Sequence, residues 1–177
     1  MPAQAIQIRP MGEDQLAAVL AVQAACYPPP MQEAAAVVLA RLRAAPATTL
    51  VACHGDAVCA YLFAYPSLLG RVTALDAPFM PAAEPDTLYL HDLAVAPQAL
   101  GHGLARRLVR QLLDAAAGQG LRHAALVSVQ DTRRFWEGLG FEVDAGRASC
   151  AALATPLATY PGSALYMTKR LIGPEAA

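Results

Sequence analysis

Two glycines, one residue apart, precede the most regular apolar repeat in the chain. The stretch 98–106 reads QALGHGLAR, so Gly101 and Gly103 stand where a buried-strand pattern gives way to a helix. A helix N-terminus presents unpaired backbone N–H groups and a partial positive charge, and it therefore binds phosphate without needing a basic side chain. Glycine lets an anion approach those groups closely. The spacing favours a phosphate-binding loop; a turn with a purely backbone role is the alternative.

Two common nucleotide-binding motifs do not fit this loop. A dinucleotide fingerprint requires a small residue three positions after Gly103, and Arg106 stands there. A P-loop requires Gly-Lys-Ser/Thr at the helix start, whereas the chain has Gly103, Leu104 and Ala105. Neither a Rossmann nor a P-loop site is expected.

A histidine in the strand just before the loop is the candidate general base. The strand 87–95 reads TLYLHDLAV, and alternation predicts that Tyr89, His91, Leu93 and Val95 share one face while Asp92 faces the other way. Histidine is the side chain that ordinarily titrates nearest neutrality, which suits it to accept a proton as a general base. The alternative is that His91 only makes a hydrogen bond, inside the core or with Asp92.

Alternating helix and strand patterns surround these residues. Alternation predicts a strand at 5–9, and apolar runs predict strands at 87–95, 122–130 and 163–171, with a short one at 141–143. Gly55-Asp56 predicts a hairpin between the runs at 48–55 and 56–68. Helices are expected from residue 13 to the prolines at 28–30, over 31–44, over 104–117 and around 132–138. Residues 68–86 and the Ala-rich segment after 143 are expected to be loops.

Length and composition narrow the classes of protein. A chain of 177 residues suits one domain, here 1–177 with a core over about 5–171. Thirteen basic residues against 14 acidic ones give a net charge of −1, so no nucleic-acid partner is expected. The four scattered cysteines predict no metal site, and no membrane-length apolar run occurs. We expect a cytoplasmic protein with reduced thiols that does not associate with membranes.

Two runs resemble the GNAT superfamily of N-acetyltransferases. LYLHDLAVAPQALGHGLARRLVRQLL is similar to the acetyl-CoA-binding segment of that family, and SVQDTRRFWEGLGFEV is similar to the second half of the same fold. The order of the expected elements agrees over about residues 5–171. The matching positions are Gln98, Gly101, Gly103, Phe135, Trp136, Gly140 and Phe141.

The resemblance implies a mixed α/β fold and an acetyl-CoA co-substrate, without a metal. The expected sheet is mixed and mostly antiparallel, with six or seven strands flanked by about four helices, and it splays open after the strand 87–95. Acetyl-CoA would lie in that opening and give its acetyl group directly to the amine of a small molecule; a homodimer is a family expectation. The cofactor-binding positions implied are Leu93, Ala94, Val95, Gln98, Gly101, His102, Gly103, Leu104, Ala105, Arg106, Thr132 and Phe135.

Three catalytic positions follow from the resemblance. The arylalkylamine branch of the family carries histidines on this strand; His91 matches the later position and Tyr89 stands at the earlier one. Trp136 stands where the family usually has a tyrosine that protonates the leaving thiolate, and an indole N–H does not titrate usefully. Trp136 can contact the sulfur, pack the pantetheine or serve as a core aromatic. Tyr160 and Tyr166 are candidates for the missing acid.

Two other functions stay open. A GNAT-fold module that binds or senses acyl-CoA with little or no catalysis is one, because of Trp136. Acetylation of protein N-termini is the other, since the loop 68–86 could close a peptide groove as well as shape a small pocket. Lesser alternatives are a nucleophilic Cys150, a phosphate contact by His102, and contacts of Arg106 and Arg107 with the 3′-phosphate of CoA rather than with solvent.

Overall fold

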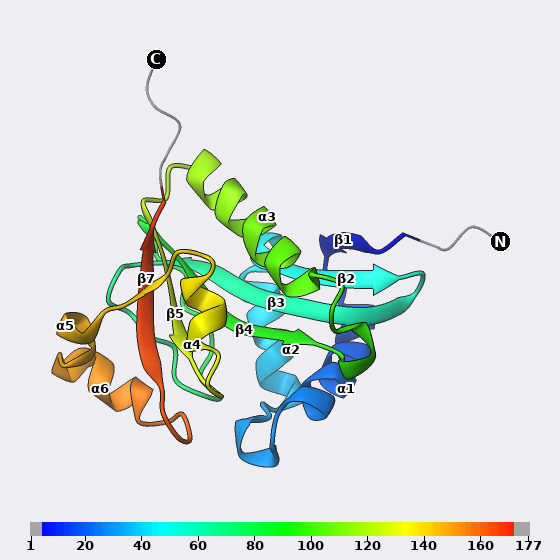
Figure 1. Ribbon diagram of the computed structural model, residues 1–177, viewed down its shortest axis with the longest axis horizontal. Coiled ribbons are helices and arrows are strands. Elements are labelled where there is room, and N and C mark those ends of the chain that lie inside the picture. Colours follow the sequence, from blue (N-terminus) through cyan, green and yellow to red (C-terminus); the bar gives the residue numbers. More distant parts are fainter. Residues whose placement is uncertain (1–4, 172–177) are drawn as a thin grey trace.

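A seven-stranded sheet forms the centre of the molecule, in the order β1-β2-β3-β4-β5-β7-β6 (Figure 1). The computed structural model describes residues 5–171. Its strands are β1 (Gln7–Pro10), β2 (Thr49–His54), β3 (Ala57–Ser67), β4 (Thr87–Val95), β5 (His123–Ser128), β6 (Glu142–Val143) and β7 (Leu165–Arg170). Among these described strands, β4 and β5 pair in parallel and all other neighbours pair antiparallel. The expected mixed, mostly antiparallel sheet is confirmed.

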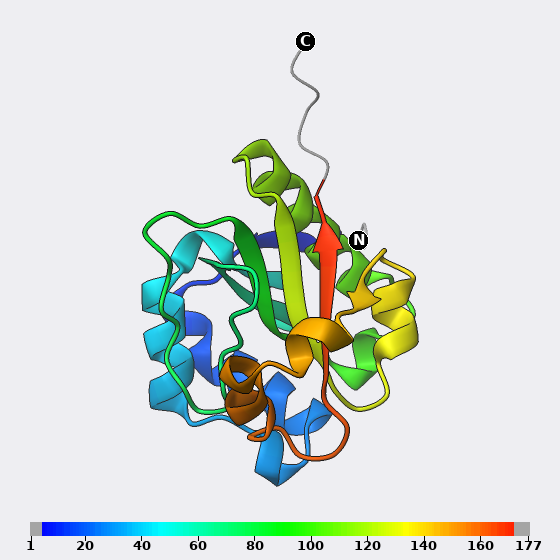
Figure 2. The same cartoon turned by 90° about the vertical axis from the view of Figure 1, so that its left-hand side faces the viewer.

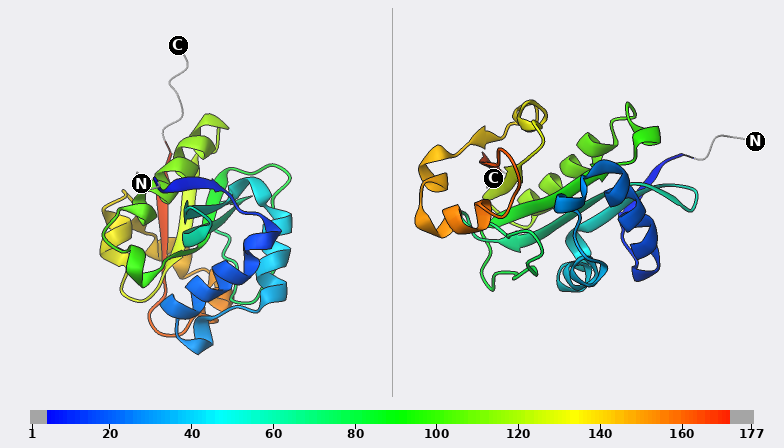
Figure 3. Two further views of the ribbon diagram at one scale, coloured as in Figure 1. Left: turned by 90° about the vertical axis from the view of Figure 1, so that its right-hand side faces the viewer. Right: turned by 90° about the horizontal axis from the view of Figure 1, so that it is seen from below.

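Helices cover both faces of this sheet. They are α1 (Leu16–Cys26), α2 (Ala35–Ala44), α3 (Leu104–Gly118), α4 (Arg133–Glu137), α5 (Ala145–Ala148) and α6 (Ala151–Leu157). Figure 3 shows α1 and α2 on one side of the sheet and α3 and α4 on the other. The apolar stripe of α3 is buried at Leu104, Leu108 and Leu112. Burial of that stripe fixes the start of α3, and with it the glycine loop, beside the sheet.

Two segments differ most from the sequence prediction. The second helix begins at Ala35 rather than at 31, because Pro29–Met31 forms a separate 3-10 turn. The Ala-rich segment forms α5 and α6 instead of a loop. Alanine has the highest helix propensity, and the Asp144 carboxylate caps α5 by accepting a hydrogen bond from the Arg147 amide at 3.0 Å.

The segment 68–86 contains no helix or strand, as predicted, and runs alongside α2 (Figure 2). Polar contacts hold it in place: the Leu69 amide donates to Asp86 Oδ1 at 2.9 Å, and the Arg41 guanidinium of α2 donates to Ala77 O at 2.7 Å. Phe79 is buried and its ring stacks on Tyr65 of β3 at 4.4 Å. This loop therefore packs against the sheet as part of the core.

The sheet opens between β4 and β5. Their parallel pairing begins with Thr87 opposite His123 and ends with Leu90 opposite Leu126. Beyond Leu90, β4 stays paired with β3 while β5 stays paired with β7. The two central strands separate at their carboxyl ends, and the splay expected after the buried strand is present.

A β-bulge lies at His91, where the two strands separate. Phe63 of β3 is opposite Asp92 and Ala64 is opposite Leu90, so His91 is an extra residue with no partner across the β3–β4 pair. An extra residue reverses the alternation of side chains that follow it in the strand. The reversal occurs beside the opening of the sheet.

The bulge corrects the predicted faces of β4. Opposite residues share a face, and Leu93 is paired with Leu62 whereas Asp92 is paired with Phe63. Leu93 and Val95 therefore lie on the α3 side, and Asp92 lies on the α1 side together with His91. The prediction that His91, Leu93 and Val95 share one face, with Asp92 on the other, is wrong, because strict alternation does not anticipate a bulge.

Candidate active site

A cavity of about 330 Å³ opens where β4 and β5 separate. The end of α1, the carboxyl ends of β4 and β5, the start of α3 and two residues of α4 contribute to its walls. Its lining residues are Cys26, Tyr27, Leu62, Leu90, His91, Asp92, Leu93, Ala94, Val95, Leu100, Ala105, Leu126, Val127, Val129, Gln130, Thr132, Phe135 and Trp136. A mainly apolar cleft with a few polar groups at one end is typical of a small-molecule site.

The structure brings most of the predicted site residues to this cavity. Those that line it are His91, Leu93, Ala94, Val95, Ala105, Thr132, Phe135 and Trp136. Those that do not are Tyr89, Gln98, Gly101, His102, Gly103, Leu104 and Arg106. Because Leu100 and Ala105 line the cavity, the glycine loop between them lies at its rim.

The glycine loop has the conformation that its sequence indicates. Gly101 and Gly103 adopt φ values of +82° and +68°, which residues with a side chain rarely adopt. The first backbone bond of α3 runs from the Arg107 amide to Gly103 O at 3.1 Å. Within residues 5–171, the amides of 101–103 donate no hydrogen bond, and nothing lies within 4 Å of a Cβ built at either glycine. Free N–H groups in open space meet the requirements of an anion site.

The basic side chains near the loop already have partners in the protein. The Arg106 guanidinium lies 5.5 Å from the ring centre of Phe135 and donates to Gly138 O at 3.3 Å, so it links α3 to α4. Arg107 donates to Ile6 O at 3.4 Å, and His102 Nδ1 lies 3.1 Å from Leu100 O. The charge available to an anion at this loop comes mainly from the backbone.

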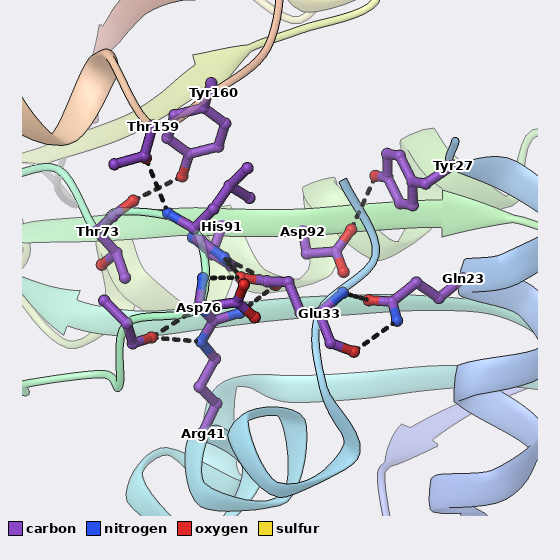
Figure 4. Close-up of polar contacts among 12 residues, drawn as sticks. Gln23, Tyr27, Glu33, Arg41, Thr73, Asp76, His91, Asp92, Thr159 and Tyr160 are labelled. Carbon is purple, nitrogen blue, oxygen red and sulfur yellow. Dashed lines mark hydrogen bonds and ion pairs between the residues drawn. The ribbon is translucent and has the colours of Figure 1, made fainter. Parts of the chain in front are cut away.

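The imidazole of His91 is turned away from the cavity into a buried polar cluster (Figure 4). Its side chain is 1% exposed, and Nε2 lies 3.2 Å from Glu33 Oε2. Glu33 also pairs with Arg41, and its Oε1 accepts a hydrogen bond from the Asp76 amide at 2.9 Å. The exposed part of His91 is its main chain, so the backbone of the bulge lines the cavity.

One ring nitrogen of His91 is left without a partner. Nδ1 is buried and forms no hydrogen bond with any residue of the described range 5–171. The ring of Phe79 meets the imidazole edge to face at 5.4 Å between ring centres and covers it. Burial alone would raise the pKa of Glu33, but the hydrogen bonds and charges of His91 and Arg41 outweigh it and lower that pKa to about 2. Glu33 is therefore an anion that holds Nε2 and leaves Nδ1 free.

Sequence reasoning expected Tyr27 at the border of the acceptor site but missed its pairing with Asp92 in the cavity wall. The Tyr27 hydroxyl lies 2.8 Å from Asp92 Oδ1 and 3.0 Å from Leu93 O, and the Tyr61 hydroxyl donates to Asp92 Oδ2 at 2.9 Å. Burial raises the pKa of both Tyr27 and Asp92. Tyr27 follows α1 directly, but only the bulge brings Asp92 to it, and no sequence signal for the bulge was recognised.

Trp136 lines the cavity and is also part of an aromatic cluster. It is 7% exposed, and its ring meets Phe135 at 4.9 Å and Phe141 at 5.6 Å, both edge to face. The packing interpretation is therefore confirmed, and the place of Trp136 in the cavity wall leaves its contact with a ligand a prediction.

The other candidate proton donors lie elsewhere. Tyr160 donates to Thr73 O at 2.6 Å, and the Tyr166 hydroxyl accepts from the Gly70 amide at 2.9 Å; neither lines the cavity. Tyr89 is 1% exposed, and its hydroxyl has no partner among residues 5–171. Cys150 is exposed at the start of α6 and does not line the cavity.

Searches for two other kinds of site gave negative results for the part of the chain that the structure describes. Between residues 5 and 171, no helix has the length and apolar character needed to cross a bilayer. Over the same range, His, Cys, Asp and Glu side chains form no group of three or more that could hold a metal ion.

Comparison with solved structures shows the same fold in a GNAT-like decarboxylase and in acetyltransferases. The GphF GNAT-like decarboxylase in complex with isobutyryl-CoA matches with a TM-score of 0.73 at 18% identity, over 94% of this chain and 100% of that one. The ribosomal-protein-S18-alanine N-acetyltransferase from Escherichia coli matches with a TM-score of 0.67 at 14% identity, over 98% and 99%. A GNAT family acetyltransferase from Brucella melitensis in complex with acetyl-CoA matches with a TM-score of 0.55 at 27% identity, over 78% and 84%.

Sequence comparison assigns the family. A search of curated proteins finds no significant match. The model of the acetyltransferase (GNAT) family matches residues 16–141, which include α1, the bulged strand, the glycine loop and α4. The chain therefore belongs to the GNAT family of acetyltransferases.

Proposed function

We propose that this protein transfers the acetyl group of acetyl-CoA directly to the amine of a small molecule. The observation that carries the proposal is the cavity between β4 and β5, which has unpaired loop amides at its rim and the polar side chains of Tyr27 and Asp92 in its wall. The amides suit the diphosphate of the cofactor, which is an anion, and the polar side chains suit the thioester, which must meet a nucleophile and proton-transfer groups.

Backbone groups would provide most of the contacts with acetyl-CoA. The amides of 101–103 and the first turn of α3 would hold the diphosphate, and the strand edge at Leu93 and Val95 would lie along the pantetheine. The carbonyls of these two residues already accept hydrogen bonds, from Tyr27 at 3.0 Å and from the Cys26 thiol at 3.2 Å. Pairing with pantetheine would therefore rely on the strand N–H groups and on any remaining carbonyl lone pairs.

The acceptor side of the cleft supports a small acceptor rather than a peptide. The loop 68–86 is fastened to the segment before β7, because Leu75 donates to Thr159 Oγ1 at 3.0 Å and Tyr160 donates to Thr73 O. It is fastened to α2 through Arg41 and Ala77. A peptide groove would need all these contacts to open, whereas a small amine needs only the part of the loop at Phe79 to move.

His91 is the proposed general base. Glu33 accepts a hydrogen bond from Nε2–H of the neutral imidazole, so the lone pair of the ring is on Nδ1. Nδ1 has no partner within the described residues. The proton would move from the attacking amine to Nδ1 as the C–N bond forms. Because Phe79 covers the ring, the amine reaches Nδ1 only if the tip of the loop 68–86 moves.

A calorimetric titration tests the binding half, and CoA release tests the transfer. Acetyl-CoA and CoA should bind saturably to the ligand-free protein, and NAD should not. A panel of small primary amines should then release CoA faster than short peptides with a free N-terminus do. No binding of either CoA species would remove the main support for the function.

An acyl-CoA-binding module without turnover is the second candidate. The buried imidazole of His91, which is hydrogen-bonded to Glu33, and the tryptophan at 136 favour it, since neither presents a titrating group to the cavity in this conformation. Tight binding of acetyl-CoA with no CoA release for any amine would favour the module over the enzyme.

A further inference from the structure

The proposed transfer lacks a proton donor for the leaving thiolate, because Trp136 cannot titrate. Besides His91, the titratable residues that line the cavity are Cys26, Tyr27 and Asp92. The imidazole of His91 points into the Glu33 cluster, and a cysteine thiol is no stronger an acid than the CoA thiol that it would protonate. Tyr27 and Asp92 therefore remain as the candidates for the proton donor.

We propose that Tyr27 is the general acid that protonates the leaving thiolate, and that Asp92 is the positioning residue that passes it a proton. This inference rests on the proposed function and deepens it, because it assigns to α1 and the bulged strand the role that the family's tyrosine has on α4. Tyr27 is the catalytic group; Asp92 acts through it.

Counting protons in the cluster supports a proton on Asp92. Four groups make three short oxygen contacts: Tyr61 with Asp92, Asp92 with Tyr27, and Tyr27 with Leu93 O. The two hydroxyls supply only two protons, so with an ionised carboxylate Tyr27 cannot donate fully to both Asp92 and the carbonyl. A third proton, on Asp92 Oδ1, lets the carboxyl donate to Tyr27 and lets Tyr27 donate onward.

The relative acidities explain why Asp92 is needed. An ordinary phenol, with a pKa of about 10, is a weaker acid than a thiol at about 8.5, so tyrosine alone would protonate a thiolate uphill. Burial raises the pKa of Tyr27 further. An ordinary carboxyl group is a stronger acid than a thiol, so a carboxyl group behind the phenol supplies driving force for the coupled transfer. Burial raises the pKa of Asp92, which favours its protonated form.

The groups around Asp92 set its protonation. Tyr27 and Cys26 face it from the end of α1, Tyr61 faces it from β3, and His91 and the more distant Glu33 lie on the remaining side. The charge of His91 favours the ionised carboxylate, whereas that of Glu33 opposes it. Arg41 already pairs with Glu33, so with a neutral His91 these groups leave little net charge near Asp92, and burial then dominates.

The step balances in atoms and electrons. As the amine nitrogen bonds to the carbonyl carbon, one N–H proton passes to His91, and the C–S bond breaks with its electron pair on sulfur. The Tyr27 proton passes to the sulfur, and the Asp92 proton passes to the Tyr27 oxygen. After the amide and CoA leave, His91 loses its proton to water and Asp92 regains one, so there is no net proton change.

The kinetic test compares Tyr27→Phe and Asp92→Asn with the control Tyr166→Phe. The control substitution also removes a buried hydroxyl that accepts a hydrogen bond, but Tyr166 lies outside the cavity. Each cavity variant should lower the rate of CoA release by about 10²-fold, with little change in acetyl-CoA affinity. The rate of CoA release by the double variant should be no lower than that of either single variant, because the two groups act as a unit. The loss should be at least about tenfold larger with the oxygen-ester analogue of acetyl-CoA, whose alkoxide leaving group needs a proton more.

A second measurement does not depend on turnover. In the wild-type protein, the carboxyl carbon of Asp92, identified by its disappearance in Asp92→Asn, should still show the chemical shift of a protonated acid at pH 6, where ordinary aspartates with pKa of about 3.9 are ionised. An ionised Asp92 at pH 6 would overturn the relay. CoA release by Tyr27→Phe within twofold of wild type would also overturn it and would leave the proposed function standing. Binding of acetyl-CoA without any CoA release by the wild type would instead contradict the proposed function, and the carboxyl measurement would still decide the state of Asp92.

Discussion

Glu33 Oε2 lies 3.2 Å from Nε2 of His91, although the two residues are separated by 57 others along the chain. The carboxylate comes from the segment between α1 and α2, and the imidazole comes from the bulge in β4. Both side chains are nearly fully buried, at 4% and 1% exposed. The contact fixes the ring orientation and decides which of its nitrogens is free, which is how a carboxylate orients a catalytic histidine.

Replacing His91 tests its role as the base. His91→Gln can still donate an amide N–H toward Glu33 but cannot accept a proton, so the rate of CoA release should fall by roughly 10²–10³ at neutral pH. The affinity for acetyl-CoA, measured by calorimetry, should change little, because the side chain lies outside the cavity. His91→Ala should show the same kinetic loss together with lower stability. Turnover of His91→Gln close to that of wild type would remove His91 from the mechanism.

The Glu33 cluster also predicts how stability depends on pH. The pKa of Glu33 is lowered from an ordinary value of 4.5 to about 2 in the folded protein. A carboxyl with a lowered folded-state pKa stabilises the fold above its unfolded-state pKa, so the stabilisation should be lost as the pH falls from about 4.5 toward 2. The full effect is of the order of 3 kcal/mol. Urea unfolding at pH 6, 4 and 3 measures it.

Glu33→Gln supplies the control for the pH experiment. It should unfold more readily at pH 6, by about 3 kcal/mol or more, because it leaves Arg41 as an uncompensated buried charge. It should also lose the part of the pH dependence that Glu33 causes. An unchanged slope between pH 4 and 3 in Glu33→Gln would show that other carboxyls produce the acid sensitivity.

The glycine loop predicts a selective loss of cofactor binding. Gly103→Val should weaken acetyl-CoA binding, because a branched side chain would project into the open space beside the loop amides. Valine at φ +68° is also strained, so Gly120→Val is the matched control: Gly120 has φ +83°, nothing within 4 Å of a Cβ, and a position after the other end of α3. Calorimetry should show a loss of affinity for Gly103→Val alone. Equal affinities in the two variants would place the diphosphate elsewhere.

Helices and strands were predicted well where a regular pattern of apolar residues extends over many positions. The run at 104–117 has an unbroken helical stripe, and the helix in the structure ends one residue later, at Gly118. The strand 87–95 has the predicted bounds. The Ala-rich segment was missed because its helices are short and its alanines gave no apolar period to recognise.

The candidate site was only partly predictable from the sequence. The bulge at His91 explains most of the difference between the predicted and the observed site. Local motifs identified Ala105, Phe135 and Trp136, which line the cavity. The orientation of residues after His91 was not predictable, because a bulge depends on how β4 pairs with β3 and not on the local sequence. The partners Glu33 and Tyr27 are far from β4 in sequence, and only the packing of the α1–α2 segment brings them to it.

Trp136 provides an intrinsic probe of binding, because it is the single tryptophan in the chain and lines the cavity. Its indole is 7% exposed and contacts Phe135 and Phe141, so its emission should be that of a buried indole in the free protein. Acetyl-CoA entering the cavity would bring an amide-rich chain against one side of the ring, and the emission intensity should change saturably. The midpoint should match the calorimetric affinity and move to higher concentration in Gly103→Val but not in Gly120→Val. Saturable binding by calorimetry with constant emission would mean that the ligand lies outside the β4–β5 opening, and that the loop amides and the cavity do not form one site.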